Sequence, residues 1–183
     1  KRQMENDVVY SIEKGQWVDK DESNSTSYSP AQISSFILSK LKSYTSDVKK
    51  AVITVPALFA EKARVATLDA AKMAGIEVIS LINEPTAAAC YYASLPNVKK
   101  ITGKILVFDL GGGTFDVTVC DVQKQNIEVI TSRGDKWLGG KDFDSEIVNL
   151  MNSKYKTATG QELDLENKKP AYMEIAEQIK RAL

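Results

Sequence analysis

The residues of this chain whose types and spacing best suit phosphate chemistry lie in the segment Asp109-Leu-Gly-Gly-Gly-Thr114. Consecutive glycines carry no Cβ and can take positive φ, so their N–H groups can converge on one anion and let it approach closely. The Asp109 carboxylate could accept from a hydrated metal ion, and the Thr114 hydroxyl could donate to a phosphate. An isolated Gly-Gly-Gly is also typical of a tight hairpin turn. The flanking Asp109, Thr114 and Asp116 favour a phosphate loop over that plain turn.

The residues around the glycines predict strands on both sides. The uninterrupted apolar run 105–108 predicts a strand that is buried on both faces. After the glycines, residues 114–119 alternate strictly between polar and apolar, a period of two that predicts a second strand. The glycines therefore join two strands and do not open a helix. This excludes a Walker loop and a Rossmann fingerprint, both of which lead into a helix.

Composition excludes several other classes of function. The 183 residues include 24 basic and 24 acidic side chains without a long run of one sign, which argues against nucleic acid or an anionic membrane as a partner. Neither a transmembrane span nor the apolar core of a signal peptide is present. The absence of histidine excludes His-based nucleophilic catalysis and argues against a zinc site. Cys90 and Cys120 lack metal-binding spacing, so we expect buried thiols in a reducing compartment.

Patterns along the rest of the chain predict strands that alternate with helices. Ser29, Pro30 and Gln32 form the start of a helix with a capping box, and apolar residues at helical spacing then give that helix one apolar face. The other expected elements are a hairpin at 8–18 turning at Gly15, a polar loop at 19–28, strands at 51–55 and 76–82, helices at 61–74 and 83–92, and a linker at 95–100. This order predicts an α/β layer architecture.

Four motifs, in this order and spacing, resemble the nucleotide-binding domain of the heat-shock-70 chaperones. They are Val55–Phe59, Ile82–Ala89, Phe108–Val117 and Leu138–Asp144. The resemblance covers nearly the whole chain from about Ser29 onward. It implies a partial actin-like ATPase (ribonuclease H-like) α/β fold, with parts of two lobes that each hold a mixed sheet flanked by helices. The implied division is lobe I over residues 1–97 and lobe II over residues 98–183.

The same resemblance implies a site for ATP or ADP with Mg²⁺. The implied catalytic residues are Glu84, Asp109 and Thr114, and Asp109 and Glu84 would hold Mg²⁺ through water. The implied nucleotide-binding residues are Gly111, Gly112, Gly113, Asp116, Gly139, Gly140, Glu177, Lys180 and Arg181. The last three would hold adenine and ribose, whereas on their own they would indicate a solvated helix face opposite the apolar face of Tyr172, Ile175, Ile179 and Leu183. The segment departs from the family pattern at Lys136, Trp137 and Lys141.

The implied activity of an intact parent protein is hydrolysis of ATP to ADP and phosphate, coupled to the binding and folding of unfolded polypeptides. J-domain co-chaperones and nucleotide-exchange factors would be its further partners. One alternative is a truncated or degenerate paralogue without ATPase activity, and another is a different actin-like ATPase, either a filament protein or a sugar kinase. Asn83–Thr86 and the Glu-x-x-Lys-Arg pattern favour the chaperone family over the latter.

The extent of the chain adds three expectations. It does not begin with Met and lacks the family's first phosphate loop, which suggests a piece of a longer protein. We therefore expect weak or absent ATP turnover by these 183 residues alone. A cytoplasmic location is expected, and an organelle lumen stays open because the native N-terminus would be missing.

Overall fold

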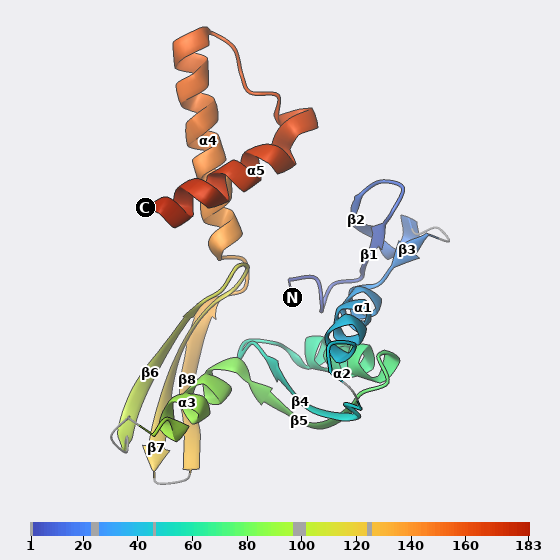
Figure 1. Ribbon diagram of the computed structural model, residues 1–183, viewed down its shortest axis with the longest axis vertical. Coiled ribbons are helices and arrows are strands. Elements are labelled where there is room, and N and C mark those ends of the chain that lie inside the picture. The colour runs from blue at the N-terminus through green and yellow to red at the C-terminus, as the bar shows by residue number, and fades with distance from the viewer. Residues whose placement is uncertain (1, 23–25, 46, 97–101, 124–125) are drawn as a thin grey trace. The chain divides into compact units, whose positions relative to one another are not determined.

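The computed structural model describes residues 2–22, 26–45, 47–96, 102–123 and 126–183 (Figure 1). Its elements in chain order are β1 (Val8–Ser11), β2 (Gln16–Asp19), the 3-10 helix η1 (Lys20–Glu22), β3 (Ser27–Tyr28), α1 (Pro30–Lys42), β4 (Lys50–Val55), α2 (Glu61–Met73), β5 (Glu77–Asn83), α3 (Glu84–Ser94), β6 (Gly103–Leu110), β7 (Phe115–Gln123), β8 (Asn126–Asp135), α4 (Gly140–Thr159) and α5 (Leu165–Ala182). The predicted α/β class is confirmed.

The chain divides into two compact units. The first unit contains Lys1–Phe108 and Asp116–Gly134, and the second contains Asp109–Phe115 and Asp135–Leu183. The predicted lobe boundary after residue 97 falls at residues outside the described part of the chain, so that division stays a prediction. None of the described helices is long and apolar enough to cross a membrane.

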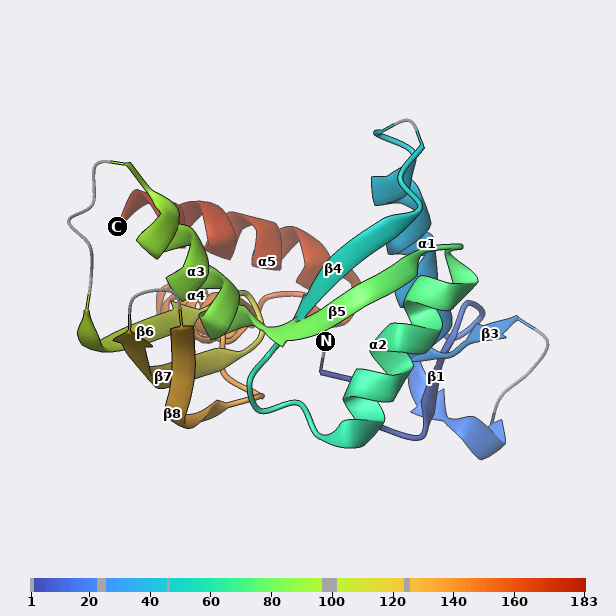
Figure 2. The same ribbon diagram turned by 90° about the horizontal axis from the view of Figure 1, so that it is seen from below.

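A βαβ arrangement forms the core of the first unit. Strands β4 and β5 are parallel, with Lys50 opposite Glu77 and Val55 opposite Asn83, and their register shifts between Ala51 and Val52. Figure 2 shows the two strands side by side with α2 next to β5. Two of the three buried residues at the centre are alanines, which lets α2 lie close to β5. The three are Ala71, Ala74 and Ile76, with Leu38, Ala51, Ile53 and Val78 packed against them.

Helix ends in this unit follow the sequence expectations. The Ser29 hydroxyl accepts from the Gln32 N–H at 3.2 Å, and the Gln32 side chain accepts from the Ser29 N–H at 2.8 Å, which completes the capping box of α1. Gly75 ends α2 with φ of 66°, a left-handed conformation that favours glycine. Lys42 donates to the Gly75 carbonyl at 2.8 Å and so satisfies an acceptor beyond that helix end.

The N-terminal segment forms a small antiparallel sheet of order β2-β1-β3. The predicted hairpin is confirmed, and Gly15 in its turn has φ of 63°. The prediction of a plain loop over 19–28 was wrong in part, because η1 and β3 lie within it. Tyr28 pairs with Tyr10 across the sheet, a long-range contact that a short polar segment does not reveal.

The glycine segment joins two neighbouring strands of a sheet of order β6-β7-β8. Since a connection as short as Gly111–Thr114 can only join antiparallel neighbours, the predicted glycine hairpin is confirmed. The prediction that 105–108 is buried on both faces was wrong, because Leu106 and Phe108 are each 63% exposed. On β7 the buried face carries Asp116 and Thr118, followed by Cys120 and Val122, and Thr114 just before the strand is buried too.

Two predicted apolar helix faces do not form the core of the units. In α1 the buried residue is Ser35, while Phe36, Ile37 and Leu41 are exposed. In α5 the buried residue is Ala176, and Ile175, Ile179 and Leu183 are exposed. In α1, Leu38 packs against the core beside the buried Ser35, and in α5, Met173 and Lys180 contact α4 beside the buried Ala176.

The two cysteines differ in environment. Cys120 is fully buried in β7, and burial, followed by the nearby Cys90 charge, raises the pKa of its thiol above the ordinary value. Cys90 on α3 is exposed, so the prediction of two buried thiols holds only for Cys120.

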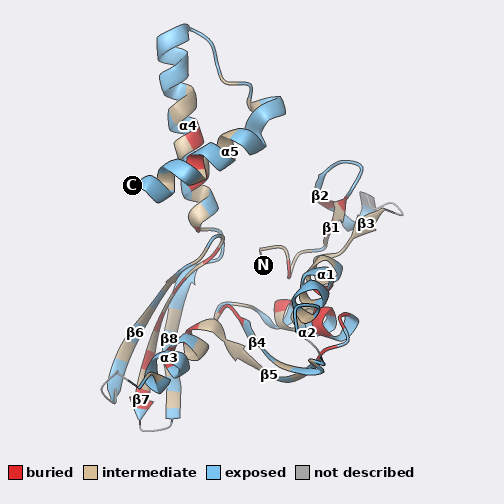
Figure 3. Cartoon of the chain, viewed as in Figure 1, coloured by how far each residue is buried: buried red, intermediate tan, exposed pale blue. Residues whose placement is uncertain are grey.

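The second unit pairs α4 with α5. Gly160, with φ of 74°, ends α4, and the Asp164 side chain accepts from the Asn167 N–H at 3.2 Å to cap α5. Figure 3 shows the buried positions of α4 and α5 gathered where the two helices cross. They are Asp144, Val148 and Ala176. A carboxylate at this crossing requires a partner, which α5 supplies.

Candidate functional site

The glycine loop 111–113 is bound to the first turn of α4. The Gly140 N–H donates to the Gly111 carbonyl at 2.9 Å, and the Lys141 N–H donates to the Gly112 carbonyl at 3.1 Å. Both groups belong to the second unit, so two glycine segments far apart in sequence form one local structure. The N-terminal N–H groups of a helix have no partner within the helix, and here the loop carbonyls accept from them.

These two contacts orient the loop. In a trans peptide the C=O and the following N–H point in opposite directions. Because the Gly111 and Gly112 carbonyls are directed at α4, the N–H groups of Gly112 and Gly113 point away from α4. Two adjacent N–H groups therefore share one side of the loop, the arrangement that binds an anion.

The N-terminus of α4 does not itself offer an anion site, although its dipole would suit one. The Asp142 N–H donates to the Gly139 carbonyl at 2.9 Å, and the Asp142 carboxylate accepts from the Gly139 N–H at 2.7 Å. With Gly140 and Lys141 held by the loop, the first three N–H groups of the helix all have protein acceptors. A phosphate would accordingly lie on the opposite side of the glycine loop.

Close approach explains the glycine at 139. A Cβ there would lie 2.4 Å from the Gly113 nitrogen and 2.6 Å from the Gly112 carbonyl carbon. By contrast, a Cβ on Gly112 would meet no atom within 4 Å. Gly112 thus leaves open space at the loop, where a methyl group would stand in the way of an approaching phosphate.

Positive φ is not the reason for the glycines at 111 and 112. Neither residue lies in the left-handed region, so the expectation that positive φ directs their N–H groups was wrong for both. The α4 contacts, and not a left-handed turn, direct the N–H groups.

The predicted polar neighbours of the loop fall on β6 and β7. Thr114 is buried, and its carbonyl accepts from the Gly111 N–H at 2.9 Å, which closes the turn. Asp109 lies half-buried near the end of β6. Asp116 is 3% exposed and lies on the same face of β7 as Thr114, since strand residues two apart share a face. Asp116 belongs to the first unit.

The metal prediction depends on Asp109 and Glu84. Glu84 is the first residue of α3 in the first unit, so the structure does not place it relative to Asp109. Among the described residues, no group of three or more His, Cys, Asp or Glu side chains could hold a metal ion. Mg²⁺ usually keeps several waters and binds through one or two carboxylates, so a half-buried Asp109 beside a phosphate loop suits it chemically.

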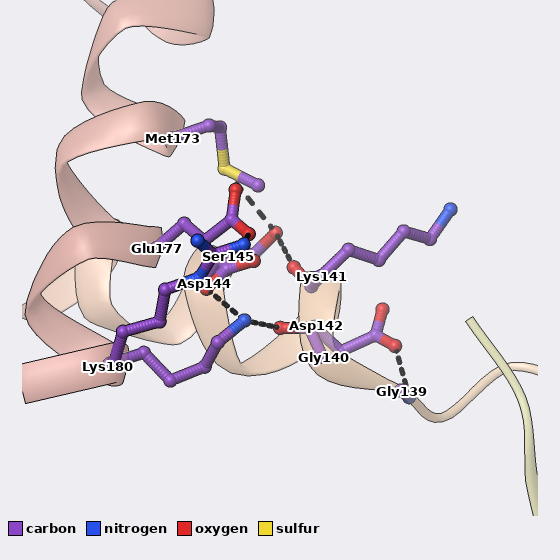
Figure 4. A network of polar contacts seen from close by, with 10 residues as sticks. Gly139, Gly140, Lys141, Asp142, Asp144, Ser145, Met173, Glu177 and Lys180 are labelled. Carbon is purple, nitrogen blue, oxygen red and sulfur yellow. Dashed lines mark hydrogen bonds and ion pairs between the residues drawn. The ribbon is translucent and has the colours of Figure 1, made fainter. Parts of the chain in front are cut away.

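Lys180 faces the second glycine turn and not bulk solvent. Its ammonium lies 2.6 Å from the Asp144 carboxylate and donates to the Gly140 carbonyl at 3.1 Å. Figure 4 shows the Lys180 side chain reaching from α5 to the first turn of α4, between those two partners. Without the family resemblance, the residue types of Glu177, Lys180 and Arg181 indicated a solvated helix face. That prediction is wrong for Lys180.

Glu177 and Arg181 form an ion pair with each other on α5, at 2.6 Å between Arg181 Nη2 and Glu177 Oε1. The arginine side chain is 75% exposed, and the two residues border a small depression together with Glu174 and Gln178. The structure brings Lys180 to Gly140, while Arg181 stays at the surface. Whether the three hold adenine and ribose stays a prediction.

Asp144 is the residue that sequence reasoning missed. It lies within the Leu138–Asp144 motif, but no pattern in the chain indicates that its partner is Lys180 on another helix. The sequence could have indicated this role through the position of Asp144 on the same helix face as Val148, because an acidic residue on the packed side of α4 requires a cation as its partner.

The residues that depart from the family pattern do not disturb this turn. The Trp137 N–H donates to the Asp135 carboxylate at 2.7 Å, which closes the turn between β8 and α4. In Figure 4 the Lys141 side chain extends away from Lys180, and only its backbone takes part in the loop contact.

A second polar cluster in the first unit surrounds the start of α3. Arg64 Nη2 donates to the Asn83 side chain at 2.8 Å, and Arg64 Nε donates to the Phe59 carbonyl at 3.0 Å. Asn83 precedes Glu84 and is the N-cap residue of α3. Arg64 thus fixes the end of β5, directly before Glu84, which is the first residue of α3 and one of the two carboxylates predicted to hold Mg²⁺.

The glycine hairpin, the second glycine turn bound to it and the α/β class agree with the actin-like ATPase superfamily that the four motifs imply. The comparison with protein families gives a match to the family described as Hsp70 protein over residues 1–183, and the chain belongs to that family. The resemblance drawn from four motifs is confirmed, and it extends to the residues before Ser29.

Membership decides against the sugar-kinase and filament-protein alternatives. The family is one of chaperone ATPases that bind nucleotide with Mg²⁺ and act with polypeptide clients and co-chaperones.

Proposed function

We propose that this chain binds the phosphates of ATP and ADP at the glycine loop 111–113, as part of a chaperone ATPase that acts on unfolded polypeptides. The observation that carries the proposal is the pair of hydrogen bonds from α4 to the Gly111 and Gly112 carbonyls. They turn the Gly112 N–H group away from α4. Backbone donors fixed in this way suit phosphoryl transfer, which needs positioning and charge neutralisation more than a strong base.

The side chains have separate roles in this proposal. Thr114 would donate to a phosphate oxygen, and Asp109 would hold Mg²⁺ through its water ligands, with Glu84 as the second carboxylate. When bound, Mg²⁺ would neutralise charge that develops on the phosphate oxygens. Asp116 would be the next acidic neighbour of the loop. Its burial beside Thr114 on β7 suits a residue that orients the threonine.

The adenosine half of the nucleotide is assigned to the second glycine turn and α5. Gly139 and Gly140 would border the base, and Glu177 and Arg181 would meet the ribose and adenine from the exposed side of the helix. Their mutual ion pair at 2.6 Å orients both side chains before a ligand arrives. The depression that they border is small, so we expect weak affinity for adenosine alone.

The test of the phosphate site is the variant Gly112→Ala in the 183-residue chain. A methyl group at this position meets no protein atom within 4 Å, so folding should be unchanged, while a phosphate could no longer approach the loop. We expect fluorescent ADP with Mg²⁺ to bind at least about tenfold more weakly, which corresponds to about 1.4 kcal/mol. Chelation of Mg²⁺ should weaken binding to the original chain as well.

Two results would contradict this proposal. One is the absence of any Mg²⁺-dependent nucleotide binding by the original chain, measured by fluorescence anisotropy and by calorimetry. The other is equal affinity of the Gly112→Ala variant and the original chain, with equal thermal unfolding of the two.

A single-turnover assay distinguishes a chain that hydrolyses ATP from a degenerate paralogue that only binds it. Release of phosphate from bound ATP that Asp109→Asn abolishes would support hydrolysis by the chain itself. Tight binding without phosphate release would instead support a binding module. In an intact parent protein we expect Glu84→Ala to lose ATPase activity. Unchanged turnover in that variant would show that Glu84 is wrongly assigned.

A further inference from the structure

Asp144 is a buried carboxylate in the second unit whose role the nucleotide motifs do not explain. The residue is 7% exposed, and it lies one helical turn after Gly140 on α4. Its partner, the Lys180 ammonium, lies 2.6 Å away on α5. In a low-dielectric surrounding such a pair is held strongly, because either charge alone would be left without compensation.

Lys180 connects this pair to a single peptide group. The Gly140 carbonyl accepts from the Lys180 ammonium at 3.1 Å, and the N–H of the same peptide group, which belongs to Lys141, donates to the Gly112 carbonyl at 3.1 Å. A cation at the carbonyl end of a peptide polarises it and strengthens the hydrogen bond that its N–H donates.

The contacts therefore form a continuous series that ends at the phosphate loop. Asp144 fixes Lys180, Lys180 polarises the Gly140–Lys141 peptide, and that peptide holds the Gly112 carbonyl (Figure 4). The next N–H along the loop is that of Gly113, which points away from α4 for the reason given above. All of these residues lie in the second unit.

Space around the turn agrees with this series. A Cβ on Gly140 would lie 3.2 Å from the Lys180 ammonium, closer than nearly all real Cβ contacts. Glycine at this position thus lets the ammonium reach the backbone carbonyl. The lysine position is set by the carboxylate on one side and by the glycine on the other.

We infer that Asp144 is a positioning residue for the phosphate loop, and that it acts through Lys180 and the Gly140–Lys141 peptide. The inference rests on the proposed function of the loop. It also assigns Lys180 a structural task at the turn, in addition to any contact with the nucleotide.

The first test uses the 183-residue chain without nucleotide. The variant Asp144→Asn keeps the shape of the side chain and removes its charge, which should release Lys180 from the Gly140 carbonyl. We expect the amide signals of Lys141 and Gly113 to shift in ¹H–¹⁵N NMR spectra, and the Lys141 amide hydrogen to exchange faster. The matched control is Glu162→Gln, which removes a carboxylate paired with Lys156 at the same 2.6 Å distance, but at an exposed site.

The second test measures Mg²⁺–ADP affinity for Asp144→Asn, Lys180→Met and the double variant. The double variant leaves no uncompensated buried charge, so it keeps the test valid if a single variant folds poorly. If Asp144 acts through Lys180, Asp144→Asn should lose affinity by about tenfold or more, as expected for one charge-assisted hydrogen bond, and the double variant should lose no more than Lys180→Met does. Glu162→Gln should bind as the original chain does.

Each outcome decides one of the two proposals. If the original chain binds nucleotide and Asp144→Asn changes neither its affinity nor the Lys141 amide signals, the positioning role is overturned and the phosphate site stands. If Lys180→Met loses affinity while Asp144→Asn does not, Lys180 is a direct ligand only and the inference is again overturned. If the original chain binds no nucleotide, the proposed function fails, and the inference that rests on it fails too.

Discussion

Gly139→Ala is the substitution that most directly tests how the two glycine segments are held together. Gly139 has φ of −178°, an extended conformation that alanine adopts without strain, so any cost must come from the added methyl group. That Cβ would lie 2.4 Å from the Gly113 nitrogen, whereas ordinary contact begins at 3.4 Å. The obstacle is backbone, which cannot rotate aside as a flexible side chain would.

The cost follows from the separation that the methyl group imposes. The loop and the turn must move apart by about 1 Å, which lengthens the Gly140–Gly111 and Lys141–Gly112 hydrogen bonds from 2.9 and 3.1 Å to about 4 Å, beyond hydrogen-bond length. Two lost bonds cost about 0.5–1.5 kcal/mol each. Residual overpacking adds about 1–3 kcal/mol, and the lower entropy of the unfolded chain returns about 0.4–1 kcal/mol. We expect a net loss of about 1–5.5 kcal/mol.

The assay is urea unfolding followed by the fluorescence of Trp137, which lies two residues from Gly139 and is 47% exposed. Trp17→Phe in every variant removes the only other tryptophan and keeps an aromatic ring beside Tyr10. Gly112→Ala is the matched control, because its methyl group enters open space. A free energy of unfolding for Gly139→Ala within about 0.5 kcal/mol of that control would refute the reasoning.

Three further predictions concern other parts of the chain. At neutral pH, native iodoacetamide labelling should modify Cys90 and spare Cys120, whose thiol is buried with a raised pKa; mass spectrometry that finds Cys120 labelled as fast would contradict this. Arg64→Lys should destabilise the first unit by about 1–3 kcal/mol in urea, since lysine cannot reach both the Asn83 side chain and the backbone carbonyl, and an unchanged midpoint would argue otherwise. A lysine on α4 lowers the pKa of Glu162 from its ordinary value of 4.5, first by a hydrogen bond and then by its charge. The small stability difference between the original chain and Glu162→Gln should therefore be present at neutral pH and vanish as the pH falls through that lowered pKa; a difference that persists in acid would refute the ion-pair explanation.

Local structure was predictable because it depends on neighbours in sequence. The capping box of α1 needs only Ser29 and Gln32, and the left-handed ends at Gly15 and Gly75 need only glycine. The strand–turn–strand reading of 105–119 followed from alternation alone. The family was also accessible from sequence, since four ordered motifs resemble it and the family match covers the whole chain.

Burial was predictable only in part, because it depends on what each face meets. In the apolar stripe of α1, Phe36, Ile37 and Leu41 are exposed, and the helix packs through Ser35 and Leu38 instead. On β7 the polar face with Asp116 and Thr118 is buried, and the Thr118 hydroxyl lies 2.7 Å from the Ser132 hydroxyl on β8. A hydrogen bond to another strand makes such burial possible, and periodicity carries no information about that partner.

By itself, the sequence determined most of the helices and strands up to β7, the family and the candidate phosphate loop, since each depends on residue types at short spacing. Only the tertiary structure decided why the loop has its shape. The α4 N–H groups hold the Gly111 and Gly112 carbonyls, and Asp144 with Lys180 holds the peptide that does so. These contacts join residues from three separate segments, and the physical reason they form is that buried polar groups must find partners wherever folding brings them together.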